Sequence, residues 1–100
     1  MLLFEWDPVK ARTNQRKHGV TFEDAIHVFL DPCSLSWQDR VEGGELRWQT
    51  IGLAGGAPLL FVAHTSVERG DDEIIRLISA RRATRKERTR YEQSRPKDVR

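Results

Sequence analysis

The chain has 100 residues, of which 38% are hydrophobic and 32% are charged, and its formal net charge at pH 7 is +2. This length and composition predict one small globular domain with a modest core. No apolar run approaches the roughly 20 residues that cross a bilayer, and Glu5 and Asp7 interrupt the only candidate for an N-terminal signal segment. The single Cys33 excludes an intramolecular disulfide and any cysteine-rich metal site. We therefore expect a cytoplasmic protein that does not act at a membrane.

The first third of the chain predicts a short strand followed by two helices. Residues 2–6 are apolar except for Glu5 and end at Asp7-Pro8, which is typical of a strand. Asp7 is placed to cap a helix that has Pro8 at its first position, and Gly19 can end that helix in the left-handed conformation. Apolar residues then recur at helical spacing over 21–30, which predicts a second helix with a core-facing side.

The rest of the chain predicts four strands and a final helix. We expect the strands over 35–38, 47–53, 59–65 and 73–80, separated by polar or glycine-rich turns, and the last of them is apolar enough on both faces to be central. Thr84 and Glu87 are spaced as a capping box, which opens a helix to about residue 93.

The order β-α-α-β-β-β-β-α predicts an α+β fold, an antiparallel meander with helices packed on one face. We expect residues 1–94 to form the single domain and residues 95–100 to be a flexible basic tail.

Charge is segregated along the chain. Few acids follow Ile75, whereas basic residues are frequent there: Arg76, Arg81, Arg82, Arg85, Lys86, Arg88, Arg90, Arg95, Lys97 and Arg100. A cationic strand–helix junction of this kind suits a polyanion such as RNA or DNA. A solvated basic helix explains the composition equally well, so composition alone leaves both interpretations open.

Four groups have the chemistry of a site. Lys17-His18 ends the first predicted helix, where the dipole favours a cation, and is either functional or a solvated pair. Arg76 shares a face with apolar residues, so it must pair with a carboxylate such as Glu45 or face an anion, and we slightly favour the anion. Arg81 and its neighbour Arg82 precede a capped helix start, where free N–H groups suit a phosphate. Glu87 is explained more simply by the capping box than as a general base.

Other residues favour structural roles. His64 alternates with Leu60 and Val62 along a strand, which predicts a hydrogen-bonded structural histidine on their face. The three histidines, at positions 18, 27 and 64, lack metal-ligand spacing, and no phosphate-loop or dinucleotide glycine pattern is present, so we expect no metal and no cofactor. The tryptophans are more typical of core or sheet packing than of base stacking.

Several segments together resemble one family, the BrnT toxins. The resemblance extends over roughly residues 3–93 and rests on the spacing of these segments: Phe4-Glu5-Trp6-Asp7, Lys10, Asn14, Lys17-His18-Gly19-Val20-Thr21-Phe22-Glu23-Asp24-Ala25, Val28-Phe29-Leu30-Asp31-Pro32, Arg47 ahead of Ile51-Gly52, Ile75-Arg76-Leu77-Ile78-Ser79-Ala80-Arg81-Arg82-Ala83-Thr84, Glu87-Arg88 and Tyr91-Glu92. The acidic pair usual before Arg47 is reduced here to Glu45-Leu46, so the resemblance leaves a carboxylate at that place uncertain.

The resemblance implies a RelE-like fold and a ribonuclease toxin of a type II toxin–antitoxin system that inhibits translation. It also implies a ribbon-helix-helix antitoxin, a two-plus-two complex and operator DNA bound through the antitoxin. Cleavage would be metal-independent, by attack of a 2′-hydroxyl on the adjacent phosphorus. Trp37, Trp48 and Leu46 are our candidates for the surface that the antitoxin covers.

Roles for individual residues follow from this resemblance. The catalytic assignments are His18 as acid or base, Lys17 to hold the substrate or lower the pKa of the base, and Arg76 and Arg81 on the phosphate. The RNA-binding assignments are Arg47, Arg82, Arg85 and Tyr91. The alternative function is a non-catalytic module that binds antitoxin or nucleic acid, such as a degenerate toxin kept as a co-repressor.

Overall fold

The computed structural model describes residues 1–55 and 58–94, and the predicted tail lies outside this part of the chain. The order of elements is β1 (Leu2–Glu5), α1 (Pro8–His18), α2 (Phe22–Ala25), η1 (Ile26–Leu30), β2 (Leu35–Glu42), β3 (Glu45–Leu53), β4 (Leu59–Arg69), β5 (Asp72–Arg82) and α3 (Arg85–Ser94). The predicted α+β order is confirmed, although the second helix continues beyond its first turn as the 3₁₀ helix η1.

The predicted caps of the first helix are present. The Val9 backbone N–H donates to the Asp7 carboxylate over 2.8 Å, Pro8 is the first helical residue, and Gly19 ends α1 at φ +69°. The β2–β3 hairpin is tighter than predicted. Residues 39–42 continue β2, and the turn is only Gly43-Gly44, both with positive φ. Paired glycines in this conformation match the twist of a two-residue hairpin, so both strands run up to the turn.

The five strands form one sheet in the order β1-β5-β4-β3-β2. Strands β2 to β5 make the predicted antiparallel meander. β1 joins the outer side of β5 in parallel, from Leu2 opposite Glu73 to Glu5 opposite Arg76. The strand over 73–80 is internal, between β1 and β4, although the middle position of the sheet belongs to β4. Only the first half of β5 has a strand on its outer side.

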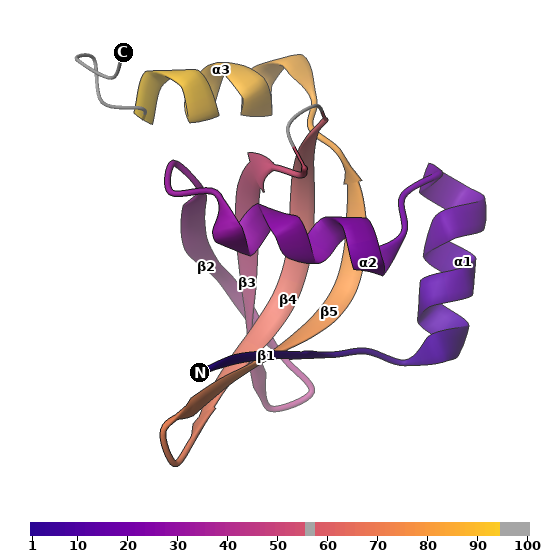
Figure 1. Cartoon of the computed structure of the whole chain (residues 1–100), viewed down its shortest axis with the longest axis vertical. Helices are drawn as coiled ribbons and strands as arrows, with labels where there is room; N and C mark the ends of the chain where they lie inside the picture. The colour runs from indigo at the N-terminus through magenta and orange to yellow at the C-terminus, as the bar shows by residue number, and fades with distance from the viewer. Residues whose placement is uncertain (56–57, 95–100) are drawn as a thin grey trace.

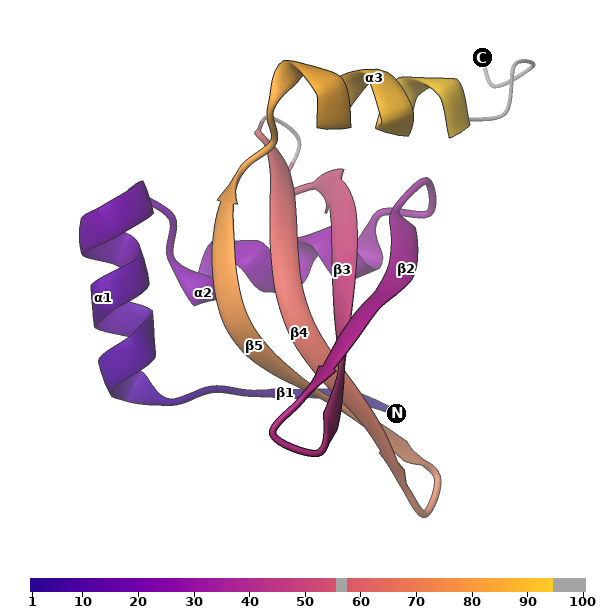
Figure 2. The ribbon, with the colours of Figure 1, turned by 180° about the vertical axis from the view of Figure 1, so that it is seen from behind.

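The helices do not all pack on one face, which corrects the sequence prediction. α2 and η1 cover one face of the sheet, α1 lies beyond the β5 edge, and α3 crosses the end of the sheet at which β5 stops (Figures 1 and 2). We call the two sides the helix-covered face and the open face, the latter being turned to the viewer in Figure 2. Of the helices in the described residues, none is long and apolar enough to cross a membrane.

The core has two parts. The larger part lies between α2, η1 and the helix-covered face, and is built on Phe22, Ala25, Val28, Leu60, Val62, Ile75, Leu77 and Ala80. The smaller part packs α3 against the opposite side of the sheet, through Tyr91 on Ile51, Leu59 and Phe61. Gly52 lets η1 approach the sheet closely, because a Cβ there would lie 2.9 Å from Val28 Cγ1.

Asn14 fastens α1 to the second half of β5. Its side-chain amide donates to the Ala80 carbonyl over 2.8 Å and its oxygen accepts from the Ala80 N–H over 3.0 Å. The same amide nitrogen also donates to the Val20 carbonyl over 3.0 Å. Asn14 is the one buried residue of α1. It therefore supplies, at this point of β5, the hydrogen bonds that a neighbouring strand would make.

Replacing Asn14 should destabilise the protein strongly. Asn14→Leu would leave the N–H and carbonyl of Ala80 buried without partners, which costs about 2–4 kcal/mol of unfolding free energy. Urea denaturation measures this loss. Gln15→Ala, one residue along on the exposed side of α1, is the matched control and should stay within about 0.5 kcal/mol of wild type. Equal stability of the Asn14 variant and this control would contradict the assignment.

Candidate nucleic-acid interface

Arg76 and Arg47 lie on the open face, each beside a carboxylate of the β2–β3 hairpin. Arg76 Nη2 donates to Glu45 Oε1, and this bond lowers the pKa of Glu45 below its ordinary value. Arg47 Nη2 lies 3.4 Å from Glu42 Oε2. Of the two partners expected for Arg76, a carboxylate and an anion, the structure shows the carboxylate, Glu45. The carboxylate that the departure from the BrnT pattern left uncertain is present.

Arg47 also retains an unused donor. Its side chain is mostly buried, and its Nε–H has no acceptor within the described ranges. A buried donor of this kind calls for a partner. On an RNA-facing surface, a phosphate or base oxygen can supply one.

Arg81 is fixed at the end of β5 by Glu87 of α3. Its Nη1 and Nη2 donate to the two carboxylate oxygens over 2.8 and 2.9 Å, a bidentate arrangement that sets the guanidinium plane. The pair lowers the pKa of Glu87 and raises that of Arg81. The predicted capping box is confirmed, because Thr84 N–H donates to Glu87 and Glu87 N–H donates to the Thr84 hydroxyl. Glu87 therefore caps α3 and orients Arg81 at the same time.

Two cation–aromatic contacts extend this arrangement across the sheet. The Arg81 guanidinium lies 4.2 Å from the Phe61 ring centroid, and the Arg90 guanidinium lies 4.1 Å from the Trp37 ring. Phe61 and Trp37 contact each other edge to face, with centroids 5.9 Å apart. Arg90, Trp37, Phe61 and Arg81 thus form a continuous row, which we call the stacking row. Its members come from α3, β2, β4 and β5.

Lys17 and His18 lie beside β5 because Asn14 docks the helix that carries them. They line a hollow of about 210 Å³ together with Lys10, Thr13 and Asn14 of α1 and Ile78 and Ser79 of β5. The register between β4 and β5 shifts at this point, so that Ile78 has no partner between Leu77 and Ser79. A bulge of this kind redirects side chains locally. The bulge lies where the end of α1 meets β5, between Arg76 and Arg81.

The other candidates lie apart from this group. Arg82 and Arg85 are exposed, and Arg82 pairs with Leu60, so it points away from the side of Arg76 and Arg81. Tyr91 is 3% exposed and its hydroxyl donates to Asp31 over 2.6 Å. Its burial is at odds with the assignment of Tyr91 to RNA binding, because the ring belongs to the core and anchors α3.

His64 has the predicted structural role. It is buried on the face of Leu60 and Val62, and burial lowers its pKa. Its Nδ1 donates to the Thr65 carbonyl over 3.2 Å, so Nε2 accepts from the Thr50 hydroxyl over 2.8 Å. Within the residues that the structure describes, no cluster of three or more histidine, cysteine, aspartate or glutamate side chains is placed to hold a metal ion.

Glu42 and Arg90 were not found from the sequence, and Trp37 was interpreted as a packing residue or as antitoxin surface. Strand alternation offers a signal for Glu42, which faces Glu45 across a two-residue turn. The contact between Arg90 and Trp37 joins distant segments, and no local pattern indicates it. Trp48 and Leu46 lie together on the helix-covered side of β3, whereas Trp37 belongs to the open face.

Two comparisons with known proteins point to the same family. A family model described as "Ribonuclease toxin, BrnT, of type II toxin-antitoxin system" matches residues 6–87. The 1.1 Å crystal structure of the ribonuclease toxin BrnT of Brucella abortus matches with a TM-score of 0.58 and 27% sequence identity, covering 85% of this chain and 99% of that chain. The comparison with curated proteins gave no significant match.

The ion pair between Arg81 and Glu87 predicts a pH-dependent stability. The folded pKa of Glu87 lies below its ordinary value of 4.5, so its contribution is present above the unfolded pKa and is lost as pH falls through the folded pKa. Glu87→Gln keeps the capping geometry and removes the charge. At neutral pH we expect its free energy of unfolding to be about 0.5–1 kcal/mol below that of wild type, a small loss because the pair is partly exposed. In strong acid the two free energies should be equal. Urea denaturation at both pH values tests this, and a pH-independent difference would contradict it.

Proposed function

This chain belongs to the BrnT family of ribonuclease toxins of type II toxin–antitoxin systems, and we propose that its RNA-cleaving site lies where the C-terminus of α1 meets β5. The observation that carries this proposal is the position of Lys17 and His18 beside Ile78 and Ser79. This stretch of β5 is flanked by Arg76 and Arg81, whose side chains lie on the open face. A proton acceptor and two phosphate ligands therefore come from one short, rigid junction.

The proposed reaction is a transesterification that uses no metal ion. His18 accepts the proton of a ribose 2′-hydroxyl, and the 2′-oxygen forms a bond to the adjacent phosphorus. The bond from phosphorus to the 5′-oxygen breaks, and this oxygen leaves with a proton supplied by Lys17. The products are a 2′,3′-cyclic phosphate and a free 5′-hydroxyl. Arg76 and Arg81 stabilise the negative charge on the non-bridging oxygens at the pentacoordinate stage.

Carboxylates hold these arginines in place before RNA arrives. Glu45 holds Arg76, Glu87 holds Arg81, and Glu42 holds Arg47. Each pair keeps a long side chain oriented toward the open face, which reduces the reorganisation needed on binding. A phosphate can then bind the remaining N–H groups of each guanidinium or replace the carboxylate, because an arginine has five donors.

As a type II toxin, the protein has an antitoxin partner and RNA as its target. We propose that this antitoxin carries a ribbon-helix-helix domain, that two copies of each form the complex, and that operator DNA is bound through the antitoxin. The cell compartment in which RNA and antitoxin meet the toxin is the cytoplasm. Size measurement of the purified complex, with and without operator DNA, tests the stoichiometry.

Single substitutions should separate the catalytic groups. In excess EDTA, His18→Ala should reduce RNA cleavage by about 10²–10⁴-fold because the base is lost. Arg81→Ala should reduce it by about 10²–10³-fold because transition-state charge is no longer neutralised. Arg81→Lys should not restore activity, since an ammonium lacks the planar fork of arginine. Cleavage rates and end-group analysis for 2′,3′-cyclic phosphate are the measurements.

Two controls match these variants. Arg12→Ala removes an exposed charge from the same helix as His18 and should leave cleavage within about twofold of wild type. Glu87→Ala breaks the same ion pair as Arg81→Ala but keeps the guanidinium, so it should reduce cleavage less than Arg81→Ala does. Full cleavage by folded His18→Ala and Arg81→Ala proteins would refute the proposed site. Growth inhibition without such cleavage would favour a ribosome-dependent nuclease or a binding module.

The stacking row should hold a base next to the cleaved phosphate. The outer side of the Arg90–Trp37 stack offers a flat surface, and base stacking on aromatic or guanidinium planes contributes about 1–3 kcal/mol. The ligand is a single-stranded RNA analogue with 2′-deoxyribose, which cannot be cleaved because it lacks the 2′-hydroxyl. Trp37→Ala should weaken its binding about tenfold. Arg90→Ala should weaken it more than Arg88→Ala, which removes the same charge from the same helix. Equal effects of Arg90→Ala and Arg88→Ala would mean that Arg90 attracts RNA by its charge alone, which would contradict base stacking.

A further inference from the structure

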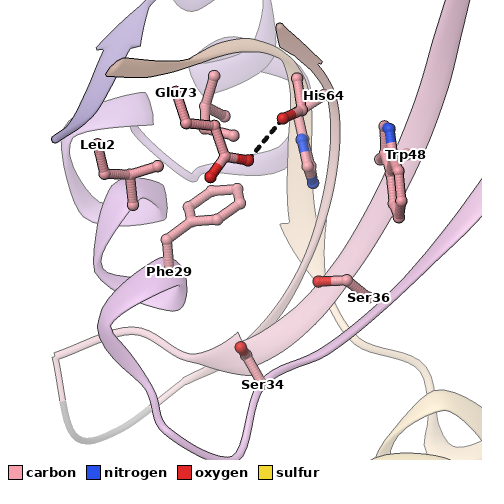
Figure 3. Close-up of a pocket in the computed structure, with 9 residues that line it drawn as sticks. Leu2, Phe29, Ser34, Ser36, Trp48, His64 and Glu73 are labelled. Atoms are coloured by element: carbon pink, nitrogen blue, oxygen red, sulfur yellow. Dashed lines mark hydrogen bonds between the residues drawn. The ribbon is translucent and has the colours of Figure 1, made fainter. Parts of the chain in front are cut away.

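A second hollow lies on the helix-covered face, opposite the proposed RNA site. Its volume is about 250 Å³. Its walls come from η1, from the loop before β2 and from each of the five strands. The side chains that give it chemical character are Phe29, Trp48, His64 and Glu73 (Figure 3). In Figure 3, Glu73 and Phe29 lie to one side of the His64 ring and Trp48 lies to the other. We call this hollow the aromatic cavity.

The rings of the aromatic cavity are held rigidly. Phe29 and His64 meet edge to face, with centroids 4.8 Å apart, and Trp48 is the cross-strand neighbour of His64. Both nitrogens of His64 are bonded inside the protein, to Thr50 and Thr65. Because burial also lowers its pKa, His64 contributes a neutral ring and no positive charge. The cavity therefore presents fixed aromatic surfaces to whatever enters it.

An acidic pair accompanies these rings. Glu73 lines the cavity, and its cross-strand neighbour on β4 is Glu68. Like charges in this position repel each other. Glu73 accepts a hydrogen bond from Ser66 over 2.6 Å, yet neither acid forms an ion pair within residues 1–55 and 58–94. No lysine or arginine is among the side chains that line the cavity. The site is therefore anionic and aromatic, a combination that attracts a cation.

An apolar rim continues from the cavity along the β2–β3 hairpin. Val41 and Leu46 are cross-strand neighbours on the side of Trp48, and they are 66% and 38% exposed. Exposed apolar side chains gathered beside a cavity are typical of a protein interface. RNA does not suit this face, because Glu68 and Glu73 would repel its phosphates.

We propose that the aromatic cavity receives an arginine or lysine side chain of the antitoxin, whose backbone runs over the apolar rim. The cation would lie against the rings of Trp48 and Phe29 and pair with Glu73, which relieves the repulsion from Glu68. This proposal rests on membership of a toxin–antitoxin family and is independent of the residues proposed to cleave RNA. It places an antitoxin anchor on the face opposite the proposed nuclease site.

The test measures the affinity of the full-length toxin for the antitoxin encoded beside it, by calorimetry at two salt concentrations. Trp48→Leu keeps an apolar side chain but removes the ring, and should weaken binding at least tenfold. Trp48→Phe keeps an aromatic face and should recover most of this loss. Glu73→Gln should weaken binding about fivefold at low salt and should reduce the salt dependence. Glu23→Gln, an exposed acid on α2, is the matched control and should bind like wild type.

Three further readouts keep the outcome clear. Thermal melts show whether each variant is folded, and Glu73→Gln is a nearly isosteric change on an exposed strand residue. RNA cleavage by the free variants should equal that of wild type, so a failed nuclease assignment would not affect this test. An alanine scan of the antitoxin's basic residues should find one whose effect disappears in the Glu73→Gln background. Affinities unchanged within twofold for both Trp48→Leu and Glu73→Gln would overturn the proposal.

Discussion

Two hydrogen bonds between the Asn14 side chain and the backbone of Ala80 join α1 to β5 beyond the end of β1. An amide can do this because it carries a donor and an acceptor at the spacing of a peptide group. Without it, the second half of β5 would leave buried polar groups unpaired and α1 would have little to hold it, since its other faces are polar. The proposed catalytic pair Lys17-His18 follows Asn14 by one helical turn, so the bond that stabilises the edge also places the site.

Asp31 joins α3 to the rest of the fold through hydrogen bonds, as Asn14 does for α1. Its carboxylate accepts from the backbone of Cys33 and Leu53 and from the Tyr91 hydroxyl, which joins the end of η1, β3 and the last helix. Tyr91 then sets the position of α3 over the sheet, and with it the positions of Glu87 and Arg90. The positions of Arg81 and Arg90 on the open face therefore depend on a partly buried carboxylate, that of Asp31.

The two faces of the sheet have opposite electrostatic characters. On the open face, arginines are held by carboxylates of neighbouring elements, which keeps the cationic groups ordered while leaving the face able to receive a polyanion. On the helix-covered face, beyond η1, acids accompany aromatic rings without basic side chains in the cavity. The proposed RNA site and the proposed antitoxin site lie on opposite faces of the sheet, so the two ligands would be separated by charge sign.

The sequence by itself determined the local elements and the family. Asp7-Pro8, Gly19 and the Thr84–Glu87 capping box act within one helical turn, and alternation placed His64 on the face of Leu60, so short-range rules sufficed. The spacing of Lys17-His18-Gly19 and Ile78-Ser79-Ala80-Arg81 indicated the BrnT family. Only the tertiary structure decided that Arg76 pairs with Glu45, that Tyr91 is buried and that Arg90 stacks on Trp37. It also decided that β1 pairs with only the first half of β5, so that Asn14 bonds to the second half. Each of these contacts joins segments far apart in the chain, and strand register, the bulge at Ile78 and core packing set them together.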